Sequence, residues 1–123
     1  MHRFFADWCY NRRAISGEAF DTYVKAYRGS GAVRGAMADY RANAEDVKQD
    51  LADADTKIAC TTMAVWGEDF YAAGGMFDMK TVWEPMAIHL RAEPIAQCGH
   101  LPQEEQPDRV NELLPDFLSD WGG

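Results

Sequence analysis

Two short apolar runs, separated by a segment of helical length, constrain the fold of this chain most. The first, over 58–65, is rich in Thr, Val, Ile and Met and is followed by W-G-E-D. The second, over 93–98, is followed by a glycine and a histidine. Apolar runs of this length predict buried strands. Because a second helical segment follows, the order strand, helix, strand, helix predicts an α/β fold with a parallel strand pair.

Three helices are expected before the first strand. Phe20, Tyr23 and Tyr27 recur at helical spacing after Ser16, which is a suitable N-cap. The break G-S-G at 29–31 ends this pattern. Helical spacing then returns in two further segments, so the expected helices cover 16–29, 32–40 and 43–54.

Two more helices are expected beside the strands. Asp78 is a suitable N-cap for a helix that runs to about Leu90, in which Pro85 causes either a late start or a kink. The last segment, 107–121, carries an amphipathic stripe interrupted by Pro115. An interior proline costs on the order of 3 kcal/mol, so a bend is expected there.

The charge and the cysteines of the chain exclude several kinds of site. The chain has 20 acidic and 12 basic residues, a net charge of −8, and its basic residues are scattered. Nucleic acid is therefore not an expected partner, because phosphate binding requires clustered Lys and Arg. Cys9, Cys60 and Cys98 are too widely spaced for a CxxC motif and are expected to be mostly buried thiols. No cofactor is expected, and a metal site built from Cys98, His100 and His89 matches no zinc pattern.

The hydropathy of the chain indicates no membrane segment. No apolar run approaches the ~20 residues that span a bilayer. The amino terminus lacks the apolar region of a signal peptide, so a cytoplasmic location is expected. The opening, M-H-R-F-F-A-D-W-C-Y, is dense in aromatic residues. These residues are expected to be buried, either against the rest of the chain or against a partner.

His100 is the residue best placed for chemistry. It follows the second expected strand, and in open α/β sheets ligands bind at the carboxyl ends of the strands. An imidazole there is a candidate general base, because its pKa lies near neutrality. The alternative is a turn histidine with no chemical role. The nearby Glu104 and Glu105 are most simply solvated charges that favour the positive end of the last helix.

Four segments together resemble a known family. They are D-Y-R-A at 39–42, I-A-C-T-T-M-A-V-W-G-E-D at 58–69, D-M-K-T-V-W-E-P at 78–85 and Q-C-G-H-L-P-Q-E-E-Q-P at 97–107. In this order they look like the C-terminal half of an α/β-hydrolase, nearest to the haloacetate dehalogenases and epoxide hydrolases. The resemblance implies a partial α/β-hydrolase fold, with a cap-like helical segment at 1–56 and the C-terminal part of the core at 57–123.

The resemblance also implies a mechanism. Such enzymes attack the substrate with an aspartate nucleophile to form an ester, and a histidine, matched by His100, activates the water that hydrolyses it. Asp69 is the acid expected to orient this histidine. Glu68 is the adjacent alternative, and some members place the acid in a region that would precede Met1. Without the family, Asp69 is a loop-capping carboxylate.

Two cap residues of the family have matches in this chain. Tyr40 matches a tyrosine that contacts the epoxide oxygen or the halide, and His2 matches a histidine that contacts the halide. Arg3 stands where the dehalogenases have a tryptophan. Without the family, Tyr40 is a packing residue on an amphipathic helix.

The chain has no nucleophile motif of the G-x-S-x-G or G-x-D-x-G kind. The isolated chain is therefore expected to have no hydrolase turnover. Three hypotheses follow: an inactive hydrolase fragment, one half of a split hydrolase that requires an N-terminal half, or an oligomeric structural or binding protein. The third predicts a homodimer or higher oligomer formed through a bare sheet edge and an uncovered apolar face.

Overall fold

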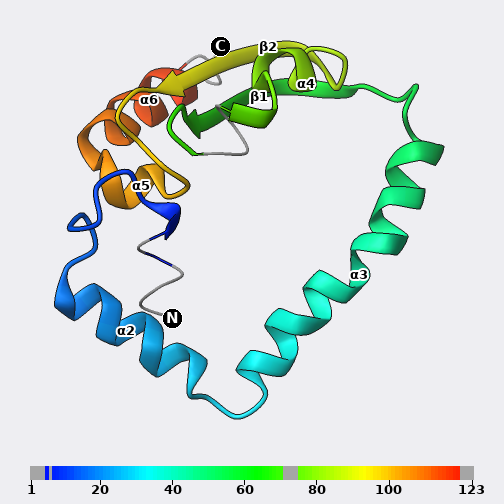
Figure 1. The fold of residues 1–123 in the computed structure, drawn as a ribbon. Helices are drawn as coiled ribbons and strands as arrows, with labels where there is room; N and C mark the ends of the chain where they lie inside the picture. Colours follow the sequence, from blue (N-terminus) through cyan, green and yellow to red (C-terminus); the bar gives the residue numbers. More distant parts are fainter. Residues whose placement is uncertain (1–4, 6, 71–74, 120–123) are drawn as a thin grey trace. The chain divides into compact units, whose positions relative to one another are not determined.

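The computed structural model of the chain describes residues 5, 7–70 and 75–119. Two compact units are found: Ser16–Lys57 is one, and the described residues of 1–15 and 58–123 make up the other. Figure 1 shows the elements of each unit. The described residues before Ser16 belong to the same unit as the strands. The predicted division into a cap-like segment 1–56 and a core part 57–123 stays a prediction.

The unit Ser16–Lys57 begins with the predicted helix. This helix, α2, spans Gly17–Tyr27. The hydroxyl oxygen of Ser16 accepts a hydrogen bond from Ala19 N at 3.1 Å, so the predicted N-cap is confirmed. Thr22 Oγ1 also donates to the carbonyl oxygen of Glu18 at 3.0 Å within the helix.

The second helix of this unit, α3, is longer than predicted. It spans Ala32–Ala52 without a break, so the prediction of separate helices at 32–40 and 43–54 is wrong. Arg41 and Ala42 are strong helix formers, and no Gly or Pro lies between the two predicted segments. Nothing in the sequence therefore ends the helix there.

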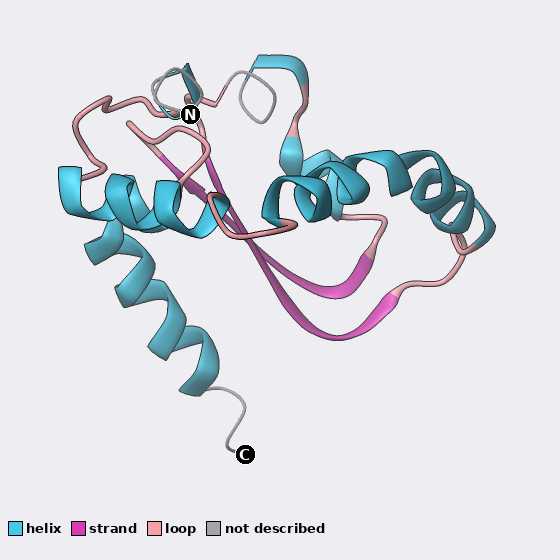
Figure 2. Cartoon of the chain, turned by 90° about the horizontal axis from the view of Figure 1, so that it is seen from below, coloured by secondary structure: helices cyan, strands magenta, loops and turns pink. Residues whose placement is uncertain are grey.

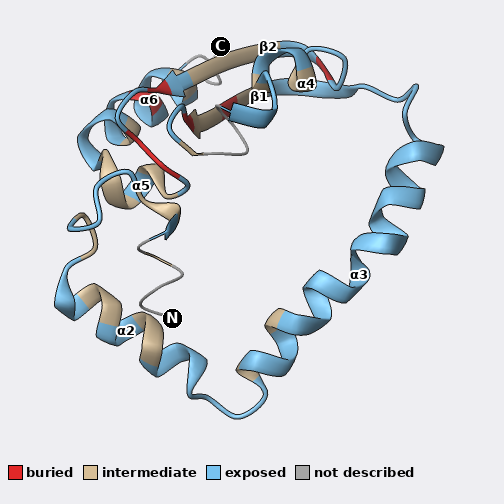
Figure 3. Cartoon of the chain, viewed as in Figure 1, coloured by how far each residue is buried: buried red, intermediate tan, exposed pale blue. Residues whose placement is uncertain are grey.

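Neither helix of the unit Ser16–Lys57 contains a buried residue. Figure 3 shows α3 almost wholly in the colour of exposed residues. Five large apolar side chains recur along α3 at helical spacing and are 43% to 72% exposed: Val33, Met37, Tyr40, Val47 and Leu51. They form an apolar stripe, called here the α3 stripe.

The other unit contains a parallel pair of strands, as predicted. β1 spans Ile58–Gly67 and β2 spans Ala87–Ile95. Figure 2 shows the two strands, in magenta, side by side. They are parallel, with Gly67 opposite Ile95 at the carboxyl ends. The α/β class is thus confirmed, and the two strands deliver the segments that follow them to the same edge of the sheet.

The helix between the strands is shorter than predicted. α4 spans Met79–Trp83, and Oδ1 of Asp78 accepts a hydrogen bond from Lys80 N at 3.1 Å, which confirms the predicted cap. The extension of this helix to Leu90 is wrong, and the strand predicted at 93–98 begins earlier. Pro85 provides no N–H for a further helical turn. The residues after it pair with β1 instead.

Two helices follow β2. The short α5 spans Pro102–Glu105 and was not predicted, whereas α6 spans Pro107–Ser119 and continues through Pro115. Leu113 on α6 is 2% exposed and packs with Ile95 and Cys98 in the core. Three partly buried residues complete this cluster, namely Met63, Val65 and Val110.

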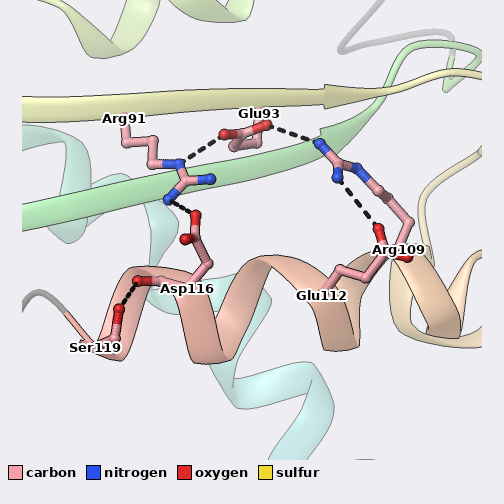
Figure 4. A network of polar contacts seen from close by, with 6 residues as sticks. All are labelled: Arg91, Glu93, Arg109, Glu112, Asp116 and Ser119. Carbon is pink, nitrogen blue, oxygen red and sulfur yellow. Dashed lines mark hydrogen bonds and ion pairs between the residues drawn. The ribbon is translucent and has the colours of Figure 1, made fainter.

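Ion pairs join β2 to α6 (Figure 4). Arg91 Nε lies 2.6 Å from Glu93 Oε1, and its Nη1 lies 2.7 Å from Asp116 Oδ2. Arg109 completes the network through Glu93 and Glu112, both at 3.4 Å. Pairs with exposed partners contribute about 0–1 kcal/mol each. The network therefore orients α6 on β2 more than it stabilises the fold.

In the described part of the chain, no helix is both long and apolar enough to cross a membrane.

Candidate functional site

His100 lies beyond the carboxyl end of β2, where the sequence predicted it. The chain reaches this position through a tight turn in which Gln97 adopts a left-handed conformation, with φ of 53°. The carbonyl oxygen of Gln97 accepts a hydrogen bond from Gln106 Nε2 at 3.2 Å. The backbone N–H of His100 donates to the carbonyl oxygen of Trp8 at 2.7 Å. Both ends of the turn are therefore tied to other segments.

Two aromatic rings contact the imidazole of His100. Phe70, in the loop after β1, stacks on it with ring centroids 4.2 Å apart and planes at 28°. Trp8 meets it edge-on, with centroids 4.7 Å apart and planes at 85°. Burial lowers the pKa of His100 below its ordinary value. At neutral pH the ring is therefore mainly uncharged, which is the form that accepts a proton.

Two glycines allow the backbone to close around this site. A Cβ at Gly67, the last residue of β1, would overlap the carbonyl oxygens of Gly99 and Cys98. A Cβ at Gly99 would overlap the carbonyl oxygen of Trp8. The end of β1, the turn that carries His100 and the amino-terminal segment are thus packed backbone against backbone, at distances that only glycine permits.

A hollow with a volume of about 480 Å³ opens beside His100. This volume is in the range of small-molecule sites. Its walls come from β1, the loop after it, α4 and the turn that carries His100. Apolar and aromatic side chains dominate the lining, which includes Trp66, Phe70, Phe77, Trp83, His100 and Pro102. The arrangement suits a small, partly apolar molecule held against the imidazole.

Asp69 lies in the loop after β1, close to the turn that carries His100. Its backbone N–H donates to the carbonyl oxygen of Cys98 at 3.0 Å, and its Oδ2 accepts from Cys98 N at 3.3 Å. These are the bonds of a loop-capping carboxylate. Within the described residues, no hydrogen bond joins Asp69 to His100, so its role as the orienting acid stays a prediction.

Comparisons with known proteins agree with this geometry. No family model matches the chain. The chain is 30% identical over 107 residues to a fluoroacetate dehalogenase from a Burkholderia species, covering 84% of this chain and 34% of that protein. It is 25% identical over 113 residues to a soluble epoxide hydrolase from Corynebacterium sp. (strain C12), covering 92% and 38%.

Solved structures match the fold over nearly the whole chain. The structure of a candidate α/β-hydrolase from Nostoc sp PCC 7120 superposes with a TM-score of 0.86 and 26% identity, covering 94% of this chain and 40% of that one. The chain has a partial α/β-hydrolase fold. The resemblance predicted from the four sequence segments is therefore confirmed. The chain spans 34% to 38% of the length of the two curated relatives that it matches.

Two substrate contacts were predicted from the sequence, Tyr40 and His2. Tyr40 lies on α3, in the unit Ser16–Lys57, and is 58% exposed. His2 lies outside the described residues. Their roles stay predictions.

Three residues of the site were missed or underestimated by sequence reasoning. Glu105, interpreted as a solvated charge, accepts hydrogen bonds from Gly99 N and Asn11 N, both at 2.9 Å. Trp8 and Phe70 contact the His100 ring. For Trp8 the aromatic-rich opening of the chain was the available signal, since it required a cover. Glu105 has no comparable signal, because its partners are backbone groups.

The cysteines offer no nucleophile at this site. Burial raises the pKa of Cys98 to about 11 and that of Cys9 likewise to about 11, with the carboxylate of Glu105 as the next cause. Both thiols are therefore protonated at neutral pH. Cys98 is buried and Cys9 half-buried, whereas Cys60 is exposed, contrary to the expected burial. No cluster of metal-ligating side chains occurs among residues 5, 7–70 and 75–119.

Proposed function

We propose that this chain is the histidine-bearing part of a hydrolase of the haloacetate dehalogenase or epoxide hydrolase type. The observation that carries the proposal is the position of His100, an imidazole at the carboxyl end of a parallel strand pair, beside an apolar hollow. The similarity to a fluoroacetate dehalogenase and to a soluble epoxide hydrolase supports it.

In this proposal His100 performs the second half of a two-step reaction. A carboxylate on another part of the enzyme first attacks the substrate carbon and forms an ester. In a haloacid the carbon–halogen bond breaks and halide leaves, whereas in an epoxide the ring C–O bond breaks and the oxygen stays on the ester and takes up a proton. His100 then removes a proton from water, which attacks the ester carbonyl and frees the carboxylate. Asp69, or an acid outside this chain, orients the imidazole. Tyr40 and His2 contact the substrate.

The proposal requires that the chain alone has no turnover. The 123 residues contain no glycine-flanked nucleophile, so the ester that His100 would hydrolyse cannot form. We expect no fluoride release from fluoroacetate, and no diol from styrene oxide, above the buffer rate. Ion-selective and chromatographic assays measure the two products. Turnover by the chain alone that is lost in His100→Ala would contradict the proposal.

A second candidate function is self-association as a structural or binding protein. The α3 stripe exposes five large apolar side chains, and the described residues form a sheet of only two strands, so each strand has one edge without a strand partner there. Exposed apolar stripes and strand edges are both surfaces through which chains associate. A homodimer is the simplest closed assembly that would bury both surfaces.

Light scattering after size exclusion tests self-association. We expect a mass near twice the 13.8 kDa of one chain, and a shift toward one chain in Leu51→Glu, because this residue of the α3 stripe is 72% exposed and its replacement should not disturb the fold. Gln49→Glu adds the same charge outside the stripe and should leave the dimer intact. A monomer at every concentration would exclude this candidate.

A further inference from the structure

Glu105 joins two segments that lie far apart in the sequence. One carboxylate oxygen, Oε1, accepts a hydrogen bond from Gly99 N at 2.9 Å. The other, Oε2, accepts from Asn11 N at 2.9 Å, across 94 positions of sequence. The same carboxylate, after burial, raises the pKa of the Cys9 thiol. Glu105 thus holds the segment that contains Trp8 against the turn that contains His100.

The two segments held by Glu105 are those that position the His100 ring. The backbone N–H of His100 donates to Trp8 O at 2.7 Å, and the Trp8 ring contacts the imidazole edge-on. Gly99 N, which Glu105 binds, is adjacent to His100 along the chain. Without the carboxylate, neither the turn nor the Trp8 segment retains its charge-assisted hydrogen bond.

We infer that Glu105 is a positioning residue for His100, acting by tying the turn at Gly99 to the amino-terminal segment at Asn11. A carboxylate suits this task, because each of its two oxygens accepts one backbone N–H. As a contribution to catalysis, this inference rests on the proposed function. As a statement about what holds the imidazole, it stands without it.

The sign of one pKa shift separates positioning from a simple charge effect. Burial between Trp8 and Phe70 lowers the pKa of His100. If Glu105 holds this packing, loosening it exposes the ring, and the pKa of His100 rises toward its ordinary value. If Glu105 acted only as a nearby negative charge, a substitution that keeps the charge would leave the pKa unchanged, and one that removes the charge would lower it.

The test is Glu105→Asp in the full chain, which keeps the charge but is too short to reach both N–H groups. We expect exchange of the Gly99 and Asn11 amide hydrogens to become about tenfold faster, in line with the loss of charge-assisted hydrogen bonds. The pKa of His100, titrated by NMR, should rise. Glu104→Asp shortens the neighbouring carboxylate equally and should change neither the two amides nor His100.

Folding is monitored through the amide of Ala64 in β1, which is buried and distant from these bonds along the chain. Wild-type exchange at Gly99 and Asn11 in Glu105→Asp, or an unchanged or lowered pKa of His100, would overturn the inference. If Glu105→Asp does not fold, Glu105→Gln replaces it, since glutamine keeps the length but only one acceptor oxygen. Retention of both protected amides in that variant would equally overturn it. None of these readouts requires turnover, so failure of the proposed hydrolase function leaves the test intact.

Discussion

Gly67→Ala is expected to destabilise the chain by about 3 kcal/mol, the upper part of the usual range for overpacking. The added Cβ would overlap the carbonyl oxygens of Gly99 and Cys98, which are backbone atoms and cannot rotate away. Relief requires a shift of the turn that carries His100 or of the end of β1. Either shift also disturbs the hydrogen bond between Asp69 N and Cys98 O.

Urea unfolding followed by tryptophan fluorescence measures this effect, since Trp8 and Trp66 lie in the affected unit. Gly75→Ala is the matched control: it lies in the same unit, and nothing would lie within 4 Å of its Cβ. We expect that change to stay within about 0.5 kcal/mol of the wild type. Equal stability of Gly67→Ala and Gly75→Ala would show that β1 and the turn are not packed as described.

The largest effect on activity is expected at His100 once a nucleophile is supplied. The proposed function places the nucleophile in the part of such an enzyme that this chain does not cover. In a mixture of this chain with that nucleophile-bearing part of the Burkholderia fluoroacetate dehalogenase, it predicts fluoride release over many turnovers. His100→Ala in the same mixture should lower steady-state turnover about 10³-fold, because water is no longer activated for the second step. The structural control is Leu114→Ala, which changes a 43% exposed side chain and should leave turnover unchanged.

Local signals in the sequence predicted part of this structure correctly. Ser16 and Asp78 cap helices as expected, because an N-cap side chain bonds to N–H groups only two or three residues away. The run that became β1 was predicted for a similar reason, since its length and its Thr, Val and Ile content are themselves properties of buried strands. Such features depend little on the rest of the fold.

Other parts depended on contacts that sequence patterns do not contain. The segment 87–90 follows the helical spacing of the residues before it, yet it is strand, because β1 offers hydrogen-bonding partners from Ile58 onward. Periodicity cannot report a partner that lies elsewhere in the chain. The reverse error occurred at 41–42, where two separate helices were expected to meet and a single helix continues on the propensity of Arg41 and Ala42.

The site, like the fold, could be predicted only in part from the sequence. The position of His100 after a strand and a glycine could be predicted, because strand ends are where side chains reach ligands in α/β sheets. The contacts of His100 could not be predicted in this way, because Trp8 reaches the turn from the amino-terminal segment and Glu105 reaches it from α5. Asp69 was predicted from the family to orient His100, and this role stays a prediction; its described hydrogen bonds go to the backbone of Cys98.

The most direct test of His100 as the second-step base is the intact mass of the nucleophile-bearing part after incubation with fluoroacetate and this chain. With His100→Ala, the account predicts that the ester formed in the first step accumulates, so that part gains the mass of the substrate less fluoride. With the wild-type chain the ester should not accumulate. Full turnover without ester accumulation in the His100→Ala mixture would contradict the account.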